Sequence, residues 1–597
     1  MASSQGTPKN ETPIVKATLS KYVPACVSTD VELKHIENGP LDENPLHKYS
    51  PNNPFSPRVR EMESNPSPLS PMSQWGMPGS EDKEEVKKIA IVGGGMSGFA
   101  AYWALRKTRY HVDLFEATDD FASLTKPILG GMPPNDVKID RSFLNCFAHT
   151  SPNLMKLCQY LKIPFISTPF NFTVSKERNI QHCRIEYLSH RMNTTSWKTW
   201  LEPSTWKLYY EIWKFHLFSM DLLGTRRRGP EDNYRTLIEG GICIQWTVGR
   251  YLDDAGYSEN FMSKYLFPLA QIVWNIESPG DLRELPIQRF VAFLWTAGVF
   301  GISPTIKILR PDGDAAERLK RRILAQKNNK TIHMNSRVES VVVRPDKGHR
   351  LLHLTLSGDR MLFYDYIIFA VPPEEALRLL GDEVTDGERE ILGNFQSTRV
   401  HAWLHSDNRL VPNGQVSSYI NWAMFGDDVP QMPCITYRLN AFNDRTCATS
   451  PLYVTLNPMI RPALKATVAE WTYSRPVINA RSLNARQHLA NIQNVTNRHL
   501  MFCGSWDGYG LHEDSVRSAF WLATRYFDAK LSFDFTDSSV TYPSAPPRTV
   551  GELSLRAFLY LLGMLIWIWK SIVAGVNSLL TSFGAGMAFM PTFLPYV

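Results

Sequence analysis

The segment Ile89-Ala-Ile-Val-Gly-Gly-Gly-Met-Ser-Gly98 decides the fold, because a β-branched apolar run breaks directly into Gly93-x-Gly95-x-x-Gly98. In a dinucleotide-binding turn, the first glycine permits the tight turn and the second lets the backbone approach a diphosphate. The third lets the following helix pack closely against the strand. The phosphates then bind unpaired N–H groups at the N-terminus of that helix. The segment therefore predicts a dinucleotide site around Gly93, Gly94, Gly95 and Gly98.

The residues that follow complete the unit. Phe99–Lys107 reads as a helix, and the apolar run Val112–Phe115 reads as a second strand that stops at Glu116. Glu116 lies 18 residues after Gly98, about where an acidic residue binds ribose hydroxyls. A glycine motif alone is weak evidence, whereas strand, glycine turn, helix, second strand and acid in this order are strong evidence. The alternative is a glycine-rich loop between buried elements.

Composition sets broad limits on the class of protein. A chain of 597 residues is too long for one ordinary core, so two or three domains are expected. The net charge of +6 is small for this length and does not argue for nucleic-acid binding. The eight cysteines are scattered without metal-ligand or disulfide spacing, which favours buried thiols in a reducing compartment and predicts no metal site.

The two ends of the chain differ in character. Residues 1–85 are rich in Pro, Ser and charged residues, so they read as a disordered tail, and Met1–Val15 lacks the apolar core of a signal peptide. From Ala557 to Val597 the one charged side chain is Lys570. This segment is expected to span a bilayer, to lie in the interface, or to form a shallow hairpin; the alternative is a buried C-terminal helix.

A second cofactor-contacting region follows a long insertion. Thr331–Val343 reads as a strand, Leu351–Leu356 as its hairpin partner, and Tyr364–Pro373 as a buried strand that ends at a proline pair. This order resembles the way in which flavoproteins with two dinucleotide-binding folds complete the domain opened by the glycine motif.

Across roughly residues 87–525 the chain resembles the FAD-binding amine-oxidase superfamily, specifically its branch of predicted NAD/FAD-binding proteins. Besides the glycine motif, the resemblance rests on an ordered series of segments: Gly130-Gly131, Val137–Asp140, Ser151–Asn153, Phe172–Ser175, Phe267–Trp274, Leu404–Asp407, Tyr453–Pro458, Phe502–Trp506 and Gly510–Asp514. The resemblance implies that the cofactor is tightly bound FAD.

The resemblance also implies roles for particular residues. Gly504 and the turn from Asp514 to Val516 are expected at the flavin pyrimidine edge and ribityl chain. The backbone of Val338 is expected to pair with the adenine, and Ser97 and Gly131 to line the diphosphate and the approach to the ring. His512 is the candidate proton donor or acceptor; the alternative is a histidine bonded to backbone near a helix start.

The sequence departs from the superfamily at Gly131-Met132-Pro133-Pro134, where relatives place Arg or His directly after the glycine pair. A second departure is Arg310–Asp314, which stands where relatives have a Gly-Gly-Ser element. These departures leave FAD binding expected, but they put an analogy to the substrates of better-known members in doubt.

The predicted fold is α/β: a Rossmann-like FAD-binding domain of the two-dinucleotide-binding-fold type, interleaved with an α+β substrate domain and followed by a C-terminal apolar membrane segment. The expected division is 1–85 for the tail; 86–155, 312–397 and 481–530 for the FAD-binding domain; 156–311 and 398–480 for the substrate domain; 531–554 for a linker; and 555–597 for the membrane-associated segment.

The expected function is an FAD-dependent oxidoreductase that acts on an apolar, lipid-like small molecule by hydride transfer to or from flavin N5. Within Trp197–Phe218, the residues Trp206, Tyr209, Tyr210, Trp213 and Leu217 are spaced as one helix face, opposite Lys207, Glu211 and Lys214. That face is expected either to border a membrane or to pack on its own domain.

Two alternatives stay open. A flavin amine oxidase would need a carboxylate or an aromatic cage beside the ring, and Trp422, Trp506 and Tyr509 are candidate cage residues. A catalytically silent FAD-binding membrane adaptor is the other alternative, for which the altered Gly131–Pro134 is the main indication. The catalytic body is expected in the cytoplasm, attached to a membrane through the C-terminus.

Overall fold

The computed structural model describes residues 86–119, 128–130, 137–139, 145–177, 188–189, 203–224, 237–239, 242–244, 246–301, 304–309, 315–325, 330–346, 349–358, 360–411, 418, 420–425, 434–439, 451–495, 498–537 and 549–582. They belong to one unit, Lys83–Val597. The predicted tail, Gly131–Pro134 and Trp197 to Glu202 lie outside the described residues.

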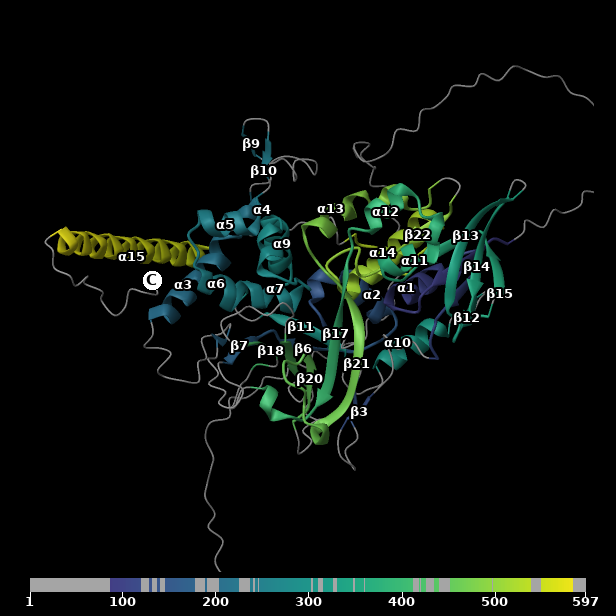
Figure 1. Ribbon diagram of the computed structural model, residues 1–597, viewed down its shortest axis with the longest axis horizontal. Helices are drawn as coiled ribbons and strands as arrows, with labels where there is room; N and C mark the ends of the chain where they lie inside the picture. Colours follow the sequence, from purple (N-terminus) through teal and green to yellow (C-terminus); the bar gives the residue numbers. More distant parts are fainter. Residues whose placement is uncertain are drawn as a thin grey trace, which may run out of the picture. The chain divides into compact units, whose positions relative to one another are not determined.

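A five-stranded parallel sheet carries the glycine motif, in the order β12-β2-β1-β16-β22, and Figure 1 labels its two edge strands, β12 and β22. Its strands are β1 (Lys88–Val92), β2 (His111–Phe115), β12 (Lys330–His333), β16 (Tyr366–Phe369) and β22 (Leu500–Phe502). Strands that lie far apart in the sequence are therefore neighbours in the sheet. The predicted Rossmann-like α/β fold is confirmed.

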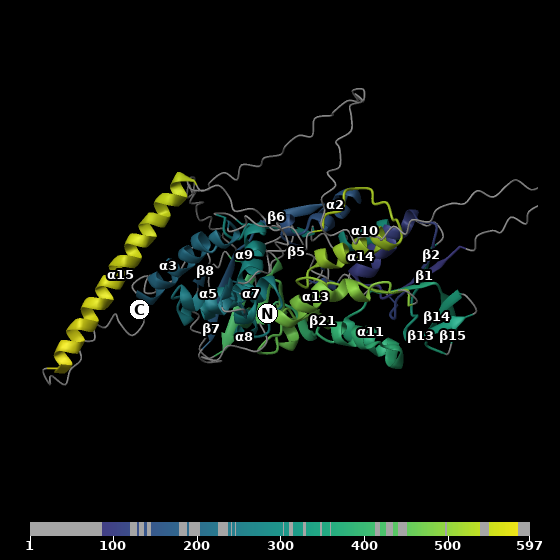
Figure 2. The ribbon, with the colours of Figure 1, turned by 90° about the horizontal axis from the view of Figure 1, so that it is seen from above.

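The two faces of this sheet bury different residues, because successive side chains of a strand point in opposite directions. Ile89 and Ile91 pack against the helices α1 (Met96–Ala104), α2, α10 and α14, whereas Ala90 and Val92 pack against the meander β13-β14-β15 and the helices α11 to α13. Figure 2 shows α10 and α14 on one side of β1 and β2, with α11 and the meander on the other.

The remaining elements on these two faces have the following bounds: α2 Pro152–Tyr160, α10 Ala315–Leu324, α14 His512–Tyr526, β13 Val338–Asp346, β14 His349–Leu356, β15 Arg360–Tyr364, α11 Pro373–Leu380, α12 Asp386–Leu392 and α13 Ala480–His488.

One sequence-based expectation about this region is wrong. Thr331–Val343 is not one strand, because β12 and β13 belong to different sheets. The chain turns between them at Asn335, whose φ of 50° lies in the left-handed region. Asparagine tolerates that region better than most residues, so the chain can turn there and divide the segment into two strands.

A second, seven-stranded mixed sheet has the order β21-β17-β20-β19-β18-β7-β8, and its long strands β17 and β21 lie side by side (Figure 1). Its strands are β7 Phe172–Glu177, β8 Leu188–Ser189, β17 Ser397–His405, β18 Ile420–Phe425, β19 Cys434–Arg438, β20 Tyr453–Leu456 and β21 Thr467–Pro476. One face packs into a large apolar core with helices from the segment between β8 and β11.

The elements of that segment and the small sheet β5-β11-β6 have these bounds: β5 Asn145–Cys146, β6 Phe165–Pro169, α3 Pro203–Phe218, α4 Asp221–Gly224, α5 Val248–Asp254, α6 Glu259–Phe261, a π-helix Met262–Leu266, α7 Phe267–Val273, α8 Pro279–Glu284, α9 Ile287–Thr296 and β11 Thr305–Leu309. The short hairpins β3-β4 and β9-β10 comprise Ile128–Gly130, Val137–Ile139, Leu237–Glu239 and Ile242–Ile244.

The helix α3 corrects the predicted division into two faces. Glu211, expected on the polar face, is 2 % exposed and accepts hydrogen bonds from the N–H and the hydroxyl of Ser258. Trp206 and Trp213 are 52 % and 42 % exposed, which disagrees with packing on their own domain and leaves the membrane-bordering alternative open. Helical spacing alone could not identify the buried face, because a distant serine supplies the partner of the glutamate.

The long helix α15 (Val550–Ser582) follows the body and packs on α3. Arg556 joins the two segments through an ion pair with Asp221 at 2.7 Å and a hydrogen bond to the carbonyl of Leu217. Within the described ranges, no helix is both long enough and apolar enough to cross a membrane. That finding gives no support to the expected spanning segment.

Candidate functional site

The glycine turn after β1 has no room for a side chain at Gly93 or Gly98. Gly93 has a φ of 106°, and a Cβ atom there would lie 2.8 Å from the carbonyl oxygen of Ala370. A Cβ atom at Gly98 would lie 1.9 Å from the carbonyl oxygen of Gly93. The first and third glycines of the motif are thus required by close contacts of the backbone, as a dinucleotide-binding turn demands.

The N-terminus of α1 presents backbone donors beside an acidic side chain. The N-cap residue Gly95 provides no side-chain cap for the amides of the first turn of this helix. Glu116, one residue beyond β2, accepts hydrogen bonds from the N–H of Gly94 at 2.9 Å and from the N–H of Thr118 at 3.0 Å. The expected diphosphate and ribose contacts therefore lie next to each other.

A second turn, after β22, lies against the first. Gly504 follows this strand, and a Cβ atom there would lie 2.1 Å from the indole nitrogen of Trp506. That indole donates a hydrogen bond to the carbonyl of Val371 at 3.2 Å, just after β16. The segments after three parallel strands thus meet at their carboxyl ends, where ligands bind in open α/β sheets.

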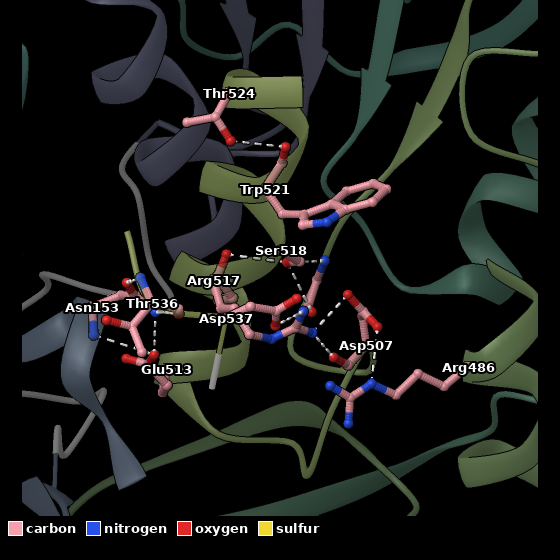
Figure 3. A network of polar contacts seen from close by, with 12 residues as sticks. Asn153, Arg486, Asp507, Glu513, Arg517, Ser518, Trp521, Thr524, Thr536 and Asp537 are labelled. Carbon is pink, nitrogen blue, oxygen red and sulfur yellow. Dashed lines mark hydrogen bonds and ion pairs between the residues drawn. The ribbon is translucent and has the colours of Figure 1, made fainter. Parts of the chain in front are cut away.

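Buried charges fix the segment between Gly504 and α14 (Figure 3). Asp507 accepts from Arg517 at 2.7 Å and pairs with Arg486 at 3.3 Å. Asp514, 5 % exposed, accepts from the N–H groups of Tyr509 and Leu511 at 2.9 and 3.0 Å. Burial raises the pKa of Asp514, and the positive charges of the two arginines oppose that rise.

Glu513 ties the same helix to the first domain segment (Figure 3). Its carboxylate accepts from the side-chain amide of Asn153 at 2.7 Å and from the backbone N–H of Leu154 at 2.8 Å, at the N-terminus of α2. Burial raises the pKa of Glu513 to about 7, while these donors act in the opposite direction. Glu513 therefore positions α14 rather than facing a ligand.

A cavity of about 540 Å³ begins at these turns and extends to the seven-stranded sheet. Its cofactor-side lining comes from the glycine turn, the β16 end, the β22 end and the start of α14: Gly95, Met96, Ser97, Ala370, Val371, Pro372, Gly504, Ser505, Trp506, Gly510, Leu511, His512 and Ser515. Its sheet-side lining includes Ile420, Tyr437, Val454, Leu456, Trp471, Tyr473 and Arg475.

The structure brings most of the predicted site residues together. Gly95, Ser97, Gly504 and His512 line the cavity, and Gly93, Gly94, Gly98 and Glu116 lie in or beside the glycine turn. His512 is the first residue of α14. The cofactor roles of these residues remain predictions, because geometry alone does not test them.

Two predicted residues lie elsewhere, and a third is outside the part of the chain that the structure describes. Val338 begins β13, is 5 % exposed and packs in the same core as Phe115. Two residues earlier, the N–H of Ser336 donates a hydrogen bond to the carbonyl of Glu116. Val516 is fully buried and does not line this cavity, whereas the neighbouring Ser515 does. Gly131 lies outside the described residues.

Of the candidate cage residues, only Trp506 lines this cavity. Trp422 is fully buried and donates to Gln271 at 2.7 Å, and Tyr509 stacks on Trp274 at 4.3 Å between ring centroids. Sequence reasoning missed Gly508, where a Cβ atom would lie 1.8 Å from the Asp514 carboxylate. The local pattern Asp507-Gly-Tyr-Gly510 was the available signal, but its role depends on α14 folding back.

These residues fit a dinucleotide cofactor such as FAD. The amides at the start of α1, which no side chain caps, suit a diphosphate, and Glu116 suits ribose hydroxyls. The cavity at the second turn offers space for a ring system between His512 and the sheet.

Comparison with known proteins agrees with the dinucleotide-binding prediction. Residues 91–161 match the family model of the NAD(P)-binding Rossmann-like domain. A search of curated proteins found no match.

Similar solved structures include an oxidoreductase from Methanosarcina mazei (12 % identity, TM-score 0.48, 73 % of this chain and 100 % of that one). Wild-type putrescine oxidase bound to putrescine is another (13 %, 0.48, 73 % and 98 %). Cyclohexylamine oxidase from Brevibacterium oxydans is a third (12 %, 0.48, 74 % and 98 %).

Proposed function

We propose that this protein is an FAD-dependent oxidoreductase that acts on an apolar, lipid-like small molecule. The observation that carries the proposal is the cavity that joins the glycine turn to the apolar inner face of the seven-stranded sheet. FAD, when bound, supplies hydride or electron transfer; the chain has to orient the substrate and exclude water. The buried side chains Ile420, Val454 and Leu456 suit both tasks for an apolar molecule.

His512 is the proposed proton donor or acceptor. Its position at the start of α14 places it in the cavity wall, close to Gly510 and Leu511. Glu513 and Asp514, the next two residues, anchor that helix start through buried hydrogen bonds. A histidine held in this way can exchange a proton with a substrate carbon or heteroatom without moving.

The rival amine-oxidase chemistry needs a carboxylate or an aromatic cage for the ammonium group. The described residues that line the cavity include no Asp or Glu, although Trp471, Tyr473 and Trp506 supply aromatic surface. We therefore favour saturation, desaturation or double-bond isomerisation of an apolar substrate over amine oxidation. A silent FAD-binding adaptor would respond to neither class of substrate.

Anaerobic photoreduction of the flavin-loaded protein separates these functions. The oxidised form should be reduced, or the reduced form reoxidised, on mixing with unsaturated lipid extracts, and neither form should respond to aliphatic amines. Reduction by amines with release of peroxide would establish the amine oxidase. No spectral change with either class would favour the adaptor.

We also propose that α15 attaches the protein to a membrane surface. The face of α15 that packs on α3 includes the buried Arg556 and Leu559. Other apolar side chains of this helix are 39–59 % exposed: Phe558, Leu561, Met564, Leu565, Ile568 and Ile572. A surface helix normally carries polar residues there, whereas a helix at a bilayer interface buries such residues in lipid. The exposed Trp206 and Trp213 of α3 suit the same boundary.

Flotation with phosphatidylcholine–phosphatidylserine vesicles tests this attachment. The wild type should float with the vesicles, and a Leu561→Glu, Leu565→Glu double variant should not. Leu464→Glu is the matched control, because Leu464 is 91 % exposed on another element and should not affect flotation. Wild-type protein that stays with the unbound fraction, or that instead buries α15 in a dimer, would contradict the proposal.

The free cysteines among the described residues support a reducing location for the body. Cys158, Cys434 and Cys503 are buried thiols, and Cys146 is half-buried. We therefore place the catalytic body on the cytoplasmic side of that membrane.

A further inference from the structure

Charge in the lining of the cavity is one-sided. Of the described lining residues, only Arg475 and His512 carry side chains that can be cationic, and none is acidic. Arg475 lies on β21, the edge strand of the seven-stranded sheet, on the same face as Trp471 and Tyr473, because residues two apart point the same way. Arg475 therefore belongs to the stretch of β21 that borders the cavity.

The acidic groups of the segment between Gly504 and α14 are already engaged. Asp507 pairs with Arg517 and Arg486, and Asp514 accepts two backbone N–H groups. Among the residues that the structure describes, Arg475 forms no ion pair with a carboxylate. A partly buried guanidinium without a counter-ion favours an anion brought by a ligand.

The position of Arg475 lies near the proposed flavin end of the cavity. The next residue, Pro476, would lie 3.1 Å from a Cβ atom built at Gly510, in the turn that leads to His512. On the sheet side, the buried Tyr437 is close enough that the charge of Arg475 acts on its pKa, which burial raises to about 12. Arg475 therefore stands between the reacting end and the apolar wall.

We propose that the substrate carries one carboxylate-type anionic group on an apolar body, and that Arg475 binds that group. This inference rests on the proposed function, since it names the chemistry of the molecule that would occupy the same cavity. It predicts that different residues bind the two parts of the substrate, the anionic head group and the apolar tail. Arg475 orients the head, and the inner face of the sheet receives the tail.

Binding of three matched probes to the full-length, flavin-loaded protein tests the proposal: dodecanoate, dodecanol and dodecylamine, each below its micelle concentration. Flavin absorbance and calorimetry report binding. Dodecanoate should bind most tightly, and Arg475→Gln should weaken it roughly ten- to a hundred-fold, as expected for loss of a hydrogen-bonded ion pair. Arg475→Lys should restore part of the affinity, and dodecanol binding should change less than about two-fold.

Charge reversal by Arg475→Glu should turn the preference toward dodecylamine. Arg461→Gln is the control, because Arg461 is an exposed arginine over Trp403 outside the cavity lining. Equal dodecanoate affinity in wild type and Arg475→Gln, or a wild-type preference for the amine, would overturn the proposal.

Failure of the proposed function remains distinguishable from failure of this inference. The FAD content is measured in the same samples, and tryptophan fluorescence reports probe binding even in colourless protein, because Trp471 and Trp506 line the cavity. Flavin-free protein with the predicted anion preference would leave the inference standing and reject the flavoprotein assignment.

Discussion

Replacing Gly98 by alanine should disrupt the diphosphate site with the smallest possible change of side chain. The new Cβ atom would lie 1.9 Å from the carbonyl oxygen of Gly93, and this contact must open by at least 1.1 Å to reach 3.0 Å. Gly93 cannot yield easily, because its N–H bonds to the carbonyl of Phe115 at 2.9 Å. The start of α1 must therefore move away from β1.

The cost of this movement follows from the packing of α1. Every residue from Met96 to Ala104 is buried, and the helix packs against Ala519 and Phe520 of α14. Overpacking of such a core costs about 1–3 kcal/mol. A shift of this size also lengthens the hydrogen bonds from α1 amides to a phosphate, each worth about 1.5–3 kcal/mol. FAD affinity should therefore fall by roughly ten-fold or more.

The assay is FAD titration together with urea unfolding of Gly98→Ala and of a control, Gly387→Ala. A Cβ atom at Gly387, in α12, meets nothing within 4 Å, so the control should keep FAD and be equally or slightly more stable. If Gly98→Ala binds FAD with wild-type affinity and unfolds at the wild-type urea concentration, the reasoning about the glycine turn is wrong.

Three further predictions concern buried charges. Burial raises the pKa of Glu513 from 4.5 to about 7, so the stability that this group contributes is fully present below pH 4.5 and is lost as the pH rises toward 7. In urea unfolding, Glu513→Gln should therefore gain stability relative to wild type as the pH rises over this range. The opposite trend would show that the hydrogen bonds from Asn153 and Leu154 to the carboxylate dominate. Asp514→Ala leaves two backbone N–H groups without their acceptor and should lower the free energy of unfolding by about 2–4 kcal/mol. Asp514→Asn keeps an acceptor oxygen and should lose much less. Equal losses in the two variants would refute the role of Asp514 as the acceptor of these N–H groups. Arg556→Ala removes the ion pair to Asp221, so hydrogen exchange in α15 should accelerate. The control Arg461→Ala should have no effect on exchange in α15. Unchanged exchange in Arg556→Ala would show that the apolar contacts of α15 are enough to hold it on α3.

The sequence predicted those parts of the fold that depend on local spacing. The glycine turn and the second strand with Glu116 have short patterns whose backbone requirements are specific, whereas Gly504 was expected at the site only from the family resemblance. The single strand predicted over Thr331–Val343 failed because one left-handed residue, Asn335, divides it between two sheets.

The rest of the site depends on contacts that no local pattern records. Glu513 meets Asn153 across 360 residues, and Arg475 reaches the cavity only through the register of β21 against β17. Helical spacing likewise could not show that Glu211 is buried against Ser258. Such placements follow from the packing of whole domains, which a single sequence does not reveal.

The cofactor content of the purified full-length protein tests the central claim most directly. We predict yellow protein that releases FAD on heat denaturation, at about one FAD per chain, with uptake by the apoprotein that Gly98→Ala impairs. Colourless protein that takes up no FAD on reconstitution would contradict the account.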